Sequence, residues 1–333
     1  IRLFDRNLPK VELDEAAHLA RVHYGLDGKL HALGGERDLN FRVDADDRTY
    51  VFKISNAEDG EAIVGLQVDA LKHIRKRDPS LPVPEVLPDQ HGQLMPRVTT
   101  GSGASHILRL VSYLPGIPVD DSPVTLRSWR EIGALMGRMN VALGSFFHPA
   151  ARENDHPWDT SNALRFQPLT THIADKSARD LVNSVFDRFR EHTKPLLDTT
   201  RHQIIHQDAH AGNVLLDPDD PERVTGLIDF GDMVYGPVIA DLAIVPDRTE
   251  RNEDKSLDVI CHAAIGFDAA FPLLENEIDL LFDVVCTRYA LGATIVAARN
   301  ALGVEGPGHM TSNAAFVTAL DELMTIGART GTQ

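Results

Sequence analysis

The sequence is poor in cysteine, in long apolar runs and in basic residues, and each shortage excludes a class of protein. Two cysteines in 333 residues cannot build a disulfide framework, so a reducing, cytoplasmic location is expected. No apolar run reaches the roughly 18 residues of a membrane helix, so no membrane partner is expected. The 33 Lys and Arg against 49 Asp and Glu give a formal net charge of −16, which argues against a nucleic-acid surface and suits a cationic ligand.

The remaining composition is that of an ordinary globular protein. Apolar residues make up 43% and charged residues 25% of the chain. A chain of 333 residues is long enough to bury a sizeable core and to form two lobes.

One stretch, residues 204–245, concentrates the polar chemistry of the chain. An apolar strand leads into a loop with Asp208 and Asn213, and a second apolar strand ends at Asp229. A carboxylate, an amide and a second carboxylate can therefore converge on one point. This set suits phosphoryl transfer, in which one aspartate accepts a proton from a hydroxyl while Asn213 and Asp229 hold Mg²⁺ through oxygen. Turn formation is the alternative role for a single loop aspartate.

Three further residues of this stretch are predicted to be structural. His206 and His210 are four residues apart, a spacing that could bind a metal on a helix. In a loop without a third nitrogen or sulfur ligand nearby, they are instead predicted to order the loop. Asp241, before Leu242 and Ala243, is predicted to brace the catalytic segment.

The motifs HQDAHAGNVL (206–215), GLIDFGD (226–232) and DLA (241–243) resemble the aminoglycoside phosphotransferase and choline kinase superfamily, small-molecule relatives of protein kinases. The resemblance implies an α+β, bilobal protein-kinase-like fold. A small antiparallel sheet lobe, residues 1–110, would bind the nucleotide, and a larger, mainly helical lobe, residues 111–333, would carry catalysis and acceptor binding. It implies Asp208 as the catalytic base and Asn213 and Asp229 as Mg²⁺ ligands.

The phosphate donor implied by the resemblance is ATP or GTP. The sequence does not distinguish the two, because the purine would be held by backbone groups around Val111 and Tyr113. The small lobe is predicted to contain a sheet of five strands, three of which alternate in polarity over residues 29–54.

The loop at residues 34–38 lies where a kinase folds a loop over the nucleotide phosphates. It lacks the Gly-x-Gly-x-x-Gly pattern, so a simple hairpin turn is the alternative. Residues 35–41 (GERDLNF) are similar to the hydroxylysine kinase-like branch. This similarity implies that Gly35 and Arg37 contact the nucleotide, and that the acceptor is an amino alcohol or a hydroxy-amino acid.

Lys53 lies in the third strand, where the family places a lysine that reaches the α- and β-phosphates; a solvent-facing lysine is the alternative. In the helix predicted over residues 61–76, Gln67 falls on the inner face and Glu61 on the opposite side. The usual lysine–glutamate pair is therefore missing. Gln67 is predicted to hydrogen-bond Lys53 without neutralising it; simple packing or capping by Gln67 is the alternative.

The large lobe is predicted to contain helices over residues 126–143, 173–192, 256–270 and 278–300. Asp232, which follows the Asp-Phe-Gly triplet, is predicted to order its loop or to hold the acceptor. Arg288 and Tyr289 lie at positions whose side chains often line the acceptor site in this family. The resemblance therefore implies that both contact the acceptor. A surface or salt-bridged position is the alternative for Arg288.

These residues together predict a phosphotransferase with an alcohol group as acceptor. The small cationic substrate is expected to be an amino alcohol or a hydroxylysine-like amino acid. An aminoglycoside is one alternative, and a nucleotide-binding module without turnover is another. Relatives in this branch also lead longer chains that end in an aminotransferase-like domain, and a chain that starts at Ile1 is compatible with being part of one.

Overall fold

A computed structural model describes residues 8–35, 37–45, 48–246, 256–304 and 312–330 of the chain. The chain divides into two compact units, Ile1–Pro115 and Gly116–Gln333. This division falls five residues after the boundary that the sequence predicts.

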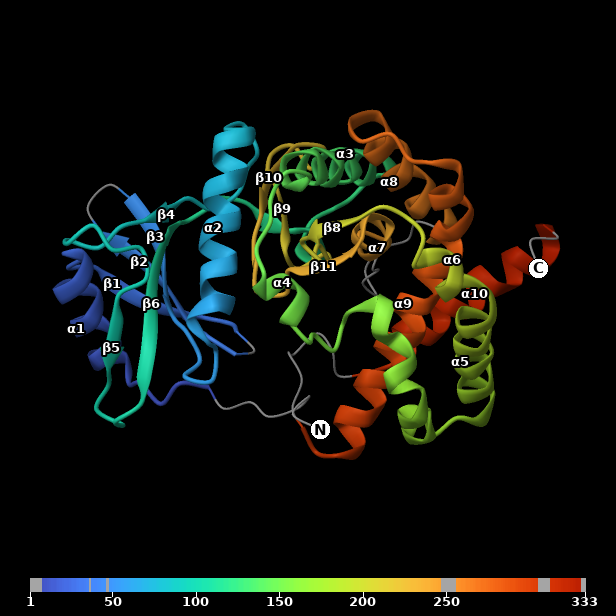
Figure 1. Ribbon diagram of the computed structural model, residues 1–333, viewed down its shortest axis with the longest axis horizontal. Helices are drawn as coiled ribbons and strands as arrows, with labels where there is room; N and C mark the ends of the chain where they lie inside the picture. Colours follow the sequence, from blue (N-terminus) through green and yellow to red (C-terminus); the bar gives the residue numbers. More distant parts are fainter. Residues whose placement is uncertain (1–7, 36, 46–47, 247–255, 305–311, 331–333) are drawn as a thin grey trace. The chain divides into compact units, whose positions relative to one another are not determined.

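The first unit is built on an antiparallel sheet with the strand order β1-β2-β3-β6-β4, in which β5 pairs with β6 (Figure 1). Its strands are β1 Lys29–Leu33, β2 Leu39–Ala45, β3 Arg48–Ile54, β4 Val86–Leu87, β5 Arg97–Thr99 and β6 Ser105–Ser112, and its helices are α1 Leu13–Tyr24 and α2 Glu61–Arg77. The sheet has six strands, so the prediction of five was wrong. Strands as short as β4 and β5 are too brief to show an alternating pattern.

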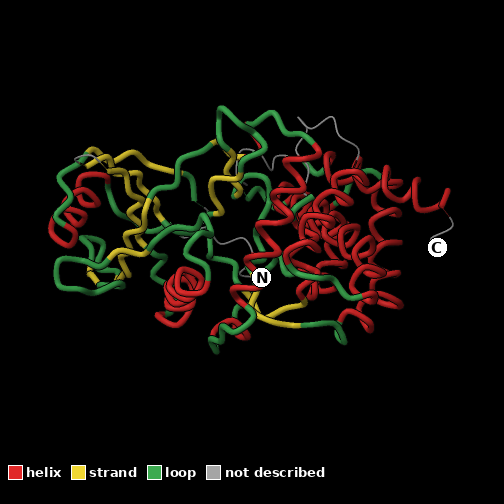
Figure 2. The backbone as a smooth tube through the Cα atoms, turned by 90° about the horizontal axis from the view of Figure 1, so that it is seen from above, coloured by secondary structure: helices red, strands yellow, loops and turns green. Residues whose placement is uncertain are grey.

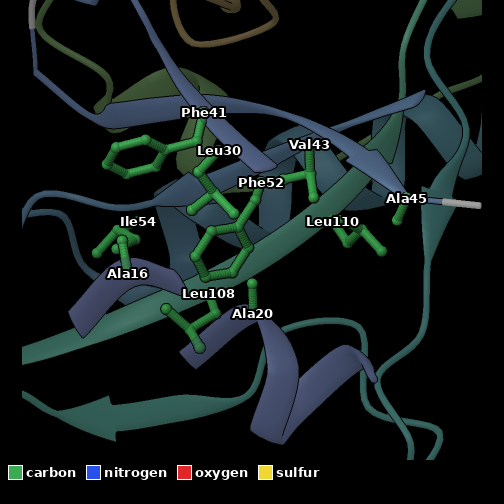
Figure 3. Close-up of a cluster of buried hydrophobic side chains, with 10 residues drawn as sticks. All are labelled: Ala16, Ala20, Leu30, Phe41, Val43, Ala45, Phe52, Ile54, Leu108 and Leu110. Carbon is green, nitrogen blue, oxygen red and sulfur yellow. The ribbon is translucent and has the colours of Figure 1, made fainter. Parts of the chain in front are cut away.

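One face of this sheet packs on α1 and forms the core of the first unit (Figure 3). The small side chains of Ala16 and Ala20 let the helix approach Phe52, which stacks on Phe41 with 6.5 Å between ring centroids. Because successive strand residues point to opposite faces, Lys53 must lie on the other face. The sheet register aligns Lys53 with Asn40 of β2 and with Arg109 of β6, which places these three polar residues together.

Helix α2 buries the apolar stripe that the sequence predicts. Its buried residues include Val64, Leu71 and Ile74, and Gln67 lies among them. Glu61 is exposed and pairs with Arg97 of β5 at 3.3 Å. The predicted orientation of the helix, with Gln67 inside and Glu61 outside, is confirmed.

The second unit is mainly helical (Figure 2). Its helices are α3 Leu126–Leu143, α4 Ala150–Glu153, α5 Lys176–Arg188, α6 Lys194–Leu197, α7 Val238–Ile244, α8 Ser256–Ala270, α9 Glu275–Ala301 and α10 Ala314–Thr330, with 3₁₀ segments at Val119–Asp121 and Thr160–His172. Two small antiparallel sheets carry the loops of the site. One has the order β10-β9-β7, and the other pairs β11 with β8; the strands are β7 Ile117–Pro118, β8 His202–Ile205, β9 Val214–Leu216, β10 Val224–Leu227 and β11 Val234–Pro237.

The helices predicted over 126–143 and 256–270 have the predicted bounds. The helix predicted over 173–192 begins three residues later, where Asp175 caps α5. It continues past Arg188 through a single π turn, Phe189–Thr193, into α6. Helix α10 has no counterpart in the prediction.

Helices α3 and α8 cross at glycines. A Cβ atom at Gly133 of α3 would lie 1.9 Å from the Ala263 carbonyl oxygen, and one at Gly266 of α8 would lie 1.8 Å from the Arg130 carbonyl oxygen. Such distances exclude any side chain at either position unless the helices separate. The crossing fixes α3, which carries Asn140 toward the loops described below.

Helix α9 is apolar and long enough to cross a membrane on length and composition alone, with a mean hydropathy of 1.6 over an 18-residue window. However, 89% of that window is buried inside the protein. This burial is the arrangement of a core helix, and α9 packs against α5, α7, α10 and the 3₁₀ segment Thr160–His172.

Candidate active site

Two loops of the second unit carry the predicted catalytic residues. The first joins β8 to β9 and contains residues 206–213, and the second joins β10 to β11 and contains residues 228–233. The amide of Ile228 donates to the carbonyl oxygen of Asn213 at 2.9 Å, which ties the two loops side by side.

Asp208 and Asn213 are brought together as the sequence predicts. The Asn213 Nδ2 group donates to the Asp208 carbonyl oxygen at 2.9 Å and to its Oδ2 atom at 2.6 Å. The Asp208 amide in turn donates to His206 Nδ1 at 3.2 Å, and the Gly212 amide donates to His210 Nδ1 at 3.0 Å. Both imidazoles therefore order their own loop, which confirms the role predicted for them.

Asp241 braces the first loop, residues 206–213, as predicted. It is fully buried, and its two carboxylate oxygens accept from the Gln207 amide and from Asn140 Nδ2, each at 2.8 Å. Burial raises the pKa of Asp241. Burial also lowers the pKa of the neighbouring His206, which keeps its ring neutral and its Nδ1 atom able to accept the Asp208 amide.

Each loop contains one residue in the left-handed backbone region. Among the non-glycine residues that the structure describes, positive φ occurs at Gln207, with 68°, and at Asp229, with 63°. Such conformations are sparsely populated by residues with a side chain and concentrate at functional sites. The surroundings hold both in place, since Asp241 accepts the Gln207 amide and Asp229 Oδ1 accepts the Gly231 amide at 3.2 Å.

The oxygen donors of these loops fit Mg²⁺. The Nδ2 group of Asn213 donates its hydrogens to Asp208. The Oδ1 atom of Asn213 makes no hydrogen bond within the described residues, so this oxygen is available to a metal ion. Within those residues there is also no cluster of three or more His, Cys, Asp or Glu that could enclose a metal. An amide oxygen and the Asp229 carboxylate match the usual demand of Mg²⁺, which completes its shell with phosphates and waters.

A segment for which the sequence predicts no role in the site, residues 154–158, contacts the second loop. Asn154 Nδ2 donates to the Met233 carbonyl oxygen at 2.9 Å. His156 Nε2 lies 2.8 Å from Asp232 Oδ1, and both side chains are largely buried. The signal available in the sequence was a cluster of polar and aromatic residues around a proline, Asp155 to Asp159, which lacks helix or strand periodicity.

Trp158, at the end of this segment, connects the first loop to α9. Its carbonyl oxygen accepts from Gln207 Nε2 at 3.1 Å and from Arg288 Nη1 at 2.8 Å, and its ring lies 4.9 Å from the Arg288 guanidinium carbon. Arg288 is only 2% exposed, so the alternative of a surface position was wrong. The hydroxyl of the equally buried Tyr289 donates to the Pro246 carbonyl oxygen. Direct contact of these two residues with an acceptor stays a prediction.

Gln67, in the first unit, has a different partner from the predicted one. Its Oε1 atom accepts a hydrogen bond from Arg109 Nη1, whereas no hydrogen bond joins Gln67 to Lys53 among the described residues. The physical reason is the register of the sheet, which places Arg109 directly beside Lys53 on the face that α2 covers. The longer side chain of Arg109 therefore reaches the amide oxygen of Gln67 and donates a hydrogen bond to it.

The loop that contains Gly35 and Arg37 leaves no room for a side chain at Gly35. A Cβ atom at Gly35 would lie 2.5 Å from the Asp38 carbonyl oxygen, so only glycine fits there. Arg37 forms an ion pair with Asp59, and burial raises the pKa of that aspartate. Glu36 lies outside the described residues. Nucleotide contacts by Gly35 and Arg37 stay predictions.

The segment predicted to meet the purine lies at the end of β6. Val111 sits between β3 and β4, and the Tyr113 amide donates to the Thr49 carbonyl oxygen at 3.2 Å. The guanidinium carbon of Arg42 lies over the Tyr113 ring, 5.2 Å from the ring centroid. The Tyr113 amide is therefore engaged within the first unit, and purine contacts in this segment stay predictions.

Comparison with known proteins places these features in a family. The sequence model described as "Phosphotransferase enzyme family" matches residues 29–272. The chain is 28% identical over 291 residues to hydroxylysine kinase from Mus musculus, which covers 81% of this chain and 77% of that protein. Among solved structures, amicoumacin kinase hAmiN in complex with AMP-PNP, Ca²⁺ and Ami has a TM-score of 0.70 at 16% identity, covering 93% of both chains. A microcompartment-associated aminopropanol kinase has a TM-score of 0.65 at 17% identity, covering 94% of this chain and 96% of that one.

These matches confirm the predicted α+β kinase-like fold, with an antiparallel sheet in the first unit and a mainly helical second unit. They also confirm the predicted class of enzyme, a phosphotransferase that acts on hydroxyl groups of small molecules. Because the matched region spans well over half of the 333 residues, the chain belongs to the phosphotransferase enzyme family.

Proposed function

We propose that the protein transfers the γ-phosphoryl group of Mg²⁺-bound ATP or GTP to a hydroxyl of an amino alcohol or a hydroxylysine-like amino acid. The observation that carries this proposal is the Asp208–Asn213 pair, a carboxylate fixed by an amide 2.6 Å away in a loop braced by the buried Asp241. The similarity to hydroxylysine kinase supports the acceptor class.

In this reaction Asp208 orients the acceptor hydroxyl and takes its proton while the hydroxyl oxygen bonds to the γ-phosphorus. The bond from that phosphorus to the bridging oxygen breaks, and the nucleoside diphosphate leaves. Lys53 binds the α- and β-phosphates as a point charge. Asn213 Oδ1 and Asp229 would hold Mg²⁺, which when bound neutralises phosphate charge.

Asp232 is the residue proposed to recognise the cationic group of the acceptor. Its side chain is 22% exposed, and one of its oxygens pairs with His156 Nε2. A partly exposed carboxylate held in one orientation suits an ammonium group, and the net charge of −16 favours the approach of a cation. The alternative role, ordering of its own loop, is also compatible with this contact.

The proposal is tested by nucleoside diphosphate release in the presence of Mg²⁺, measured with amino alcohols, hydroxy-amino acids and aminoglycosides. We expect turnover with hydroxylysine or a related amino alcohol and none without metal. Turnover confined to an aminoglycoside would replace the proposed acceptor. Nucleotide binding without phosphorylation of any compound in the panel would favour the binding module instead.

Replacing Arg288 with methionine is expected to lower kcat by about 10- to 100-fold for acceptors with and without a carboxylate alike. The reason is that Arg288 fixes the Trp158 carbonyl group, which also holds Gln207 next to Asp208. Steady-state kinetics on hydroxylysine and on an amino alcohol lacking the carboxylate check this, with the melting temperature as the folding control. A rise in KM limited to the carboxylate-bearing acceptor would instead assign Arg288 a direct contact with substrate.

A further inference from the structure

Arg109 is a buried arginine at the centre of the sheet of the first unit. It is 4% exposed and donates to three side chains from three different segments. These are Gln67 Oε1 on α2, Asp38 Oδ2 at 2.6 Å in the loop before β2, and Ser55 Oγ at 3.2 Å after β3. One guanidinium therefore ties a helix and two loops to β6.

Asp38 extends these contacts into the loop at residues 34–38. Its second oxygen accepts the Asn56 amide at 3.1 Å, and Asn56 Nδ2 donates to the Arg37 carbonyl oxygen at 3.4 Å. Arg109 thus holds the Arg37 carbonyl group, through Asp38 and Asn56, in the loop that is predicted to cover the phosphates.

The charge balance explains why residue 67 is a glutamine. Lys53 and Arg109 are paired across the sheet on one face, and like charges in that position repel. Asp38 supplies the carboxylate for Arg109, whereas Lys53 has no carboxylate partner among the described residues. A glutamate at position 67 would accept from Arg109 as Gln67 does, and it would add a negative charge beside Lys53. The neutral Gln67 adds no such charge, so the charge of Lys53 is left for an anion.

We propose that Arg109 is a positioning residue of the nucleotide site, which takes over the role of the missing lysine–glutamate pair. It holds α2 and, in the loop before β2, Arg37 and Asp38 in place. Because its partner on α2 is the neutral Gln67, Lys53 has no carboxylate partner among the described residues and can bind the nucleotide phosphates. This inference rests on the proposed function for the identity of the ligand. Lysine cannot replace Arg109. Its side chain is shorter and ends in a single ammonium group, which cannot reach the three acceptors that the planar guanidinium group contacts.

The test is Mg-ATP and Mg-GTP binding measured by calorimetry without acceptor on Arg109→Lys, Gln67→Glu and wild type. The control is Arg97→Lys, at an exposed arginine on β5 of the same sheet. We expect each of the first two variants to raise Kd about tenfold and the control to leave it unchanged. A lower melting temperature with unchanged Kd in Arg109→Lys would show a structural role only and would overturn the proposal.

A second measurement is independent of the ligand. Hydrogen exchange of the backbone amides of Gly35, Arg37 and Asp38 should be faster in nucleotide-free Arg109→Lys than in wild type and in Arg97→Lys. Unchanged exchange would overturn the proposal. If wild type binds neither nucleotide, the proposed function fails, and the exchange result decides separately whether Arg109 holds the loop.

Discussion

Replacing Asp208 with asparagine is expected to lower kcat by about a thousandfold. The amide cannot accept the proton of the acceptor hydroxyl, but its oxygen can still accept the hydrogen bond that Asn213 gives to Asp208 at 2.6 Å. The loop should therefore keep its shape, and Mg-nucleotide affinity should remain close to that of wild type. Single-turnover phosphoryl transfer at saturating nucleotide measures the effect on chemistry alone.

The matched control for this variant is Asp219→Asn, in the exposed turn between β9 and β10. It removes the same charge without touching the loop of Asp208, so its kcat should equal that of wild type. If Asp208→Asn retained wild-type kcat, proton acceptance by this carboxylate would be excluded, and the proposed mechanism would lose its base.

Replacing Gly266 with alanine is expected to lower the free energy of unfolding by about 3 kcal/mol. The added Cβ atom would lie 1.8 Å from the Arg130 carbonyl oxygen, and backbone atoms on rigid helices cannot yield as a flexible side chain can. Helices α3 and α8 must move apart and lose packing along their crossing. Denaturant unfolding, with the slope against denaturant checked for constancy, measures the change.

Ile265→Ala on the same helix is the control, because Ile265 is 49% exposed and its truncation should change stability by less than about 1 kcal/mol. The folded Gly266→Ala protein should also be less active, since α3 carries Asn140, which binds Asp241 under the catalytic loop. A variant as stable as wild type would show that the helices can separate without loss.

The sequence predicted the parts of the site that lie close together along the chain. Asp208 and Asn213 are five residues apart, and a strand on either side of a polar loop is enough to indicate that they meet. Helix α2 was predicted with its inner and outer faces correct, because a periodic apolar stripe depends only on local spacing.

The contacts that were missed depend on strand register and on segments without periodicity. Arg109 stands in an apolar strand 42 residues after Gln67, and only the pairing of β6 with β3 puts it beside Lys53. His156 and Trp158 belong to an irregular segment whose partners come from loops and a helix far away in the sequence. Neither propensity nor spacing indicates such contacts.

The left-handed conformation of Asp229 has a consequence for directed evolution. Glycine adopts positive φ without strain, and Asp229 is exposed, so selection for heat resistance alone would favour glycine at this position. Gln207 differs, because it is fully buried and donates to Trp158, so glycine there would leave a cavity and remove that hydrogen bond. Thermostability and turnover are thus opposed at Asp229, and a library screened only for survival on heating would accumulate robust but inactive enzymes there.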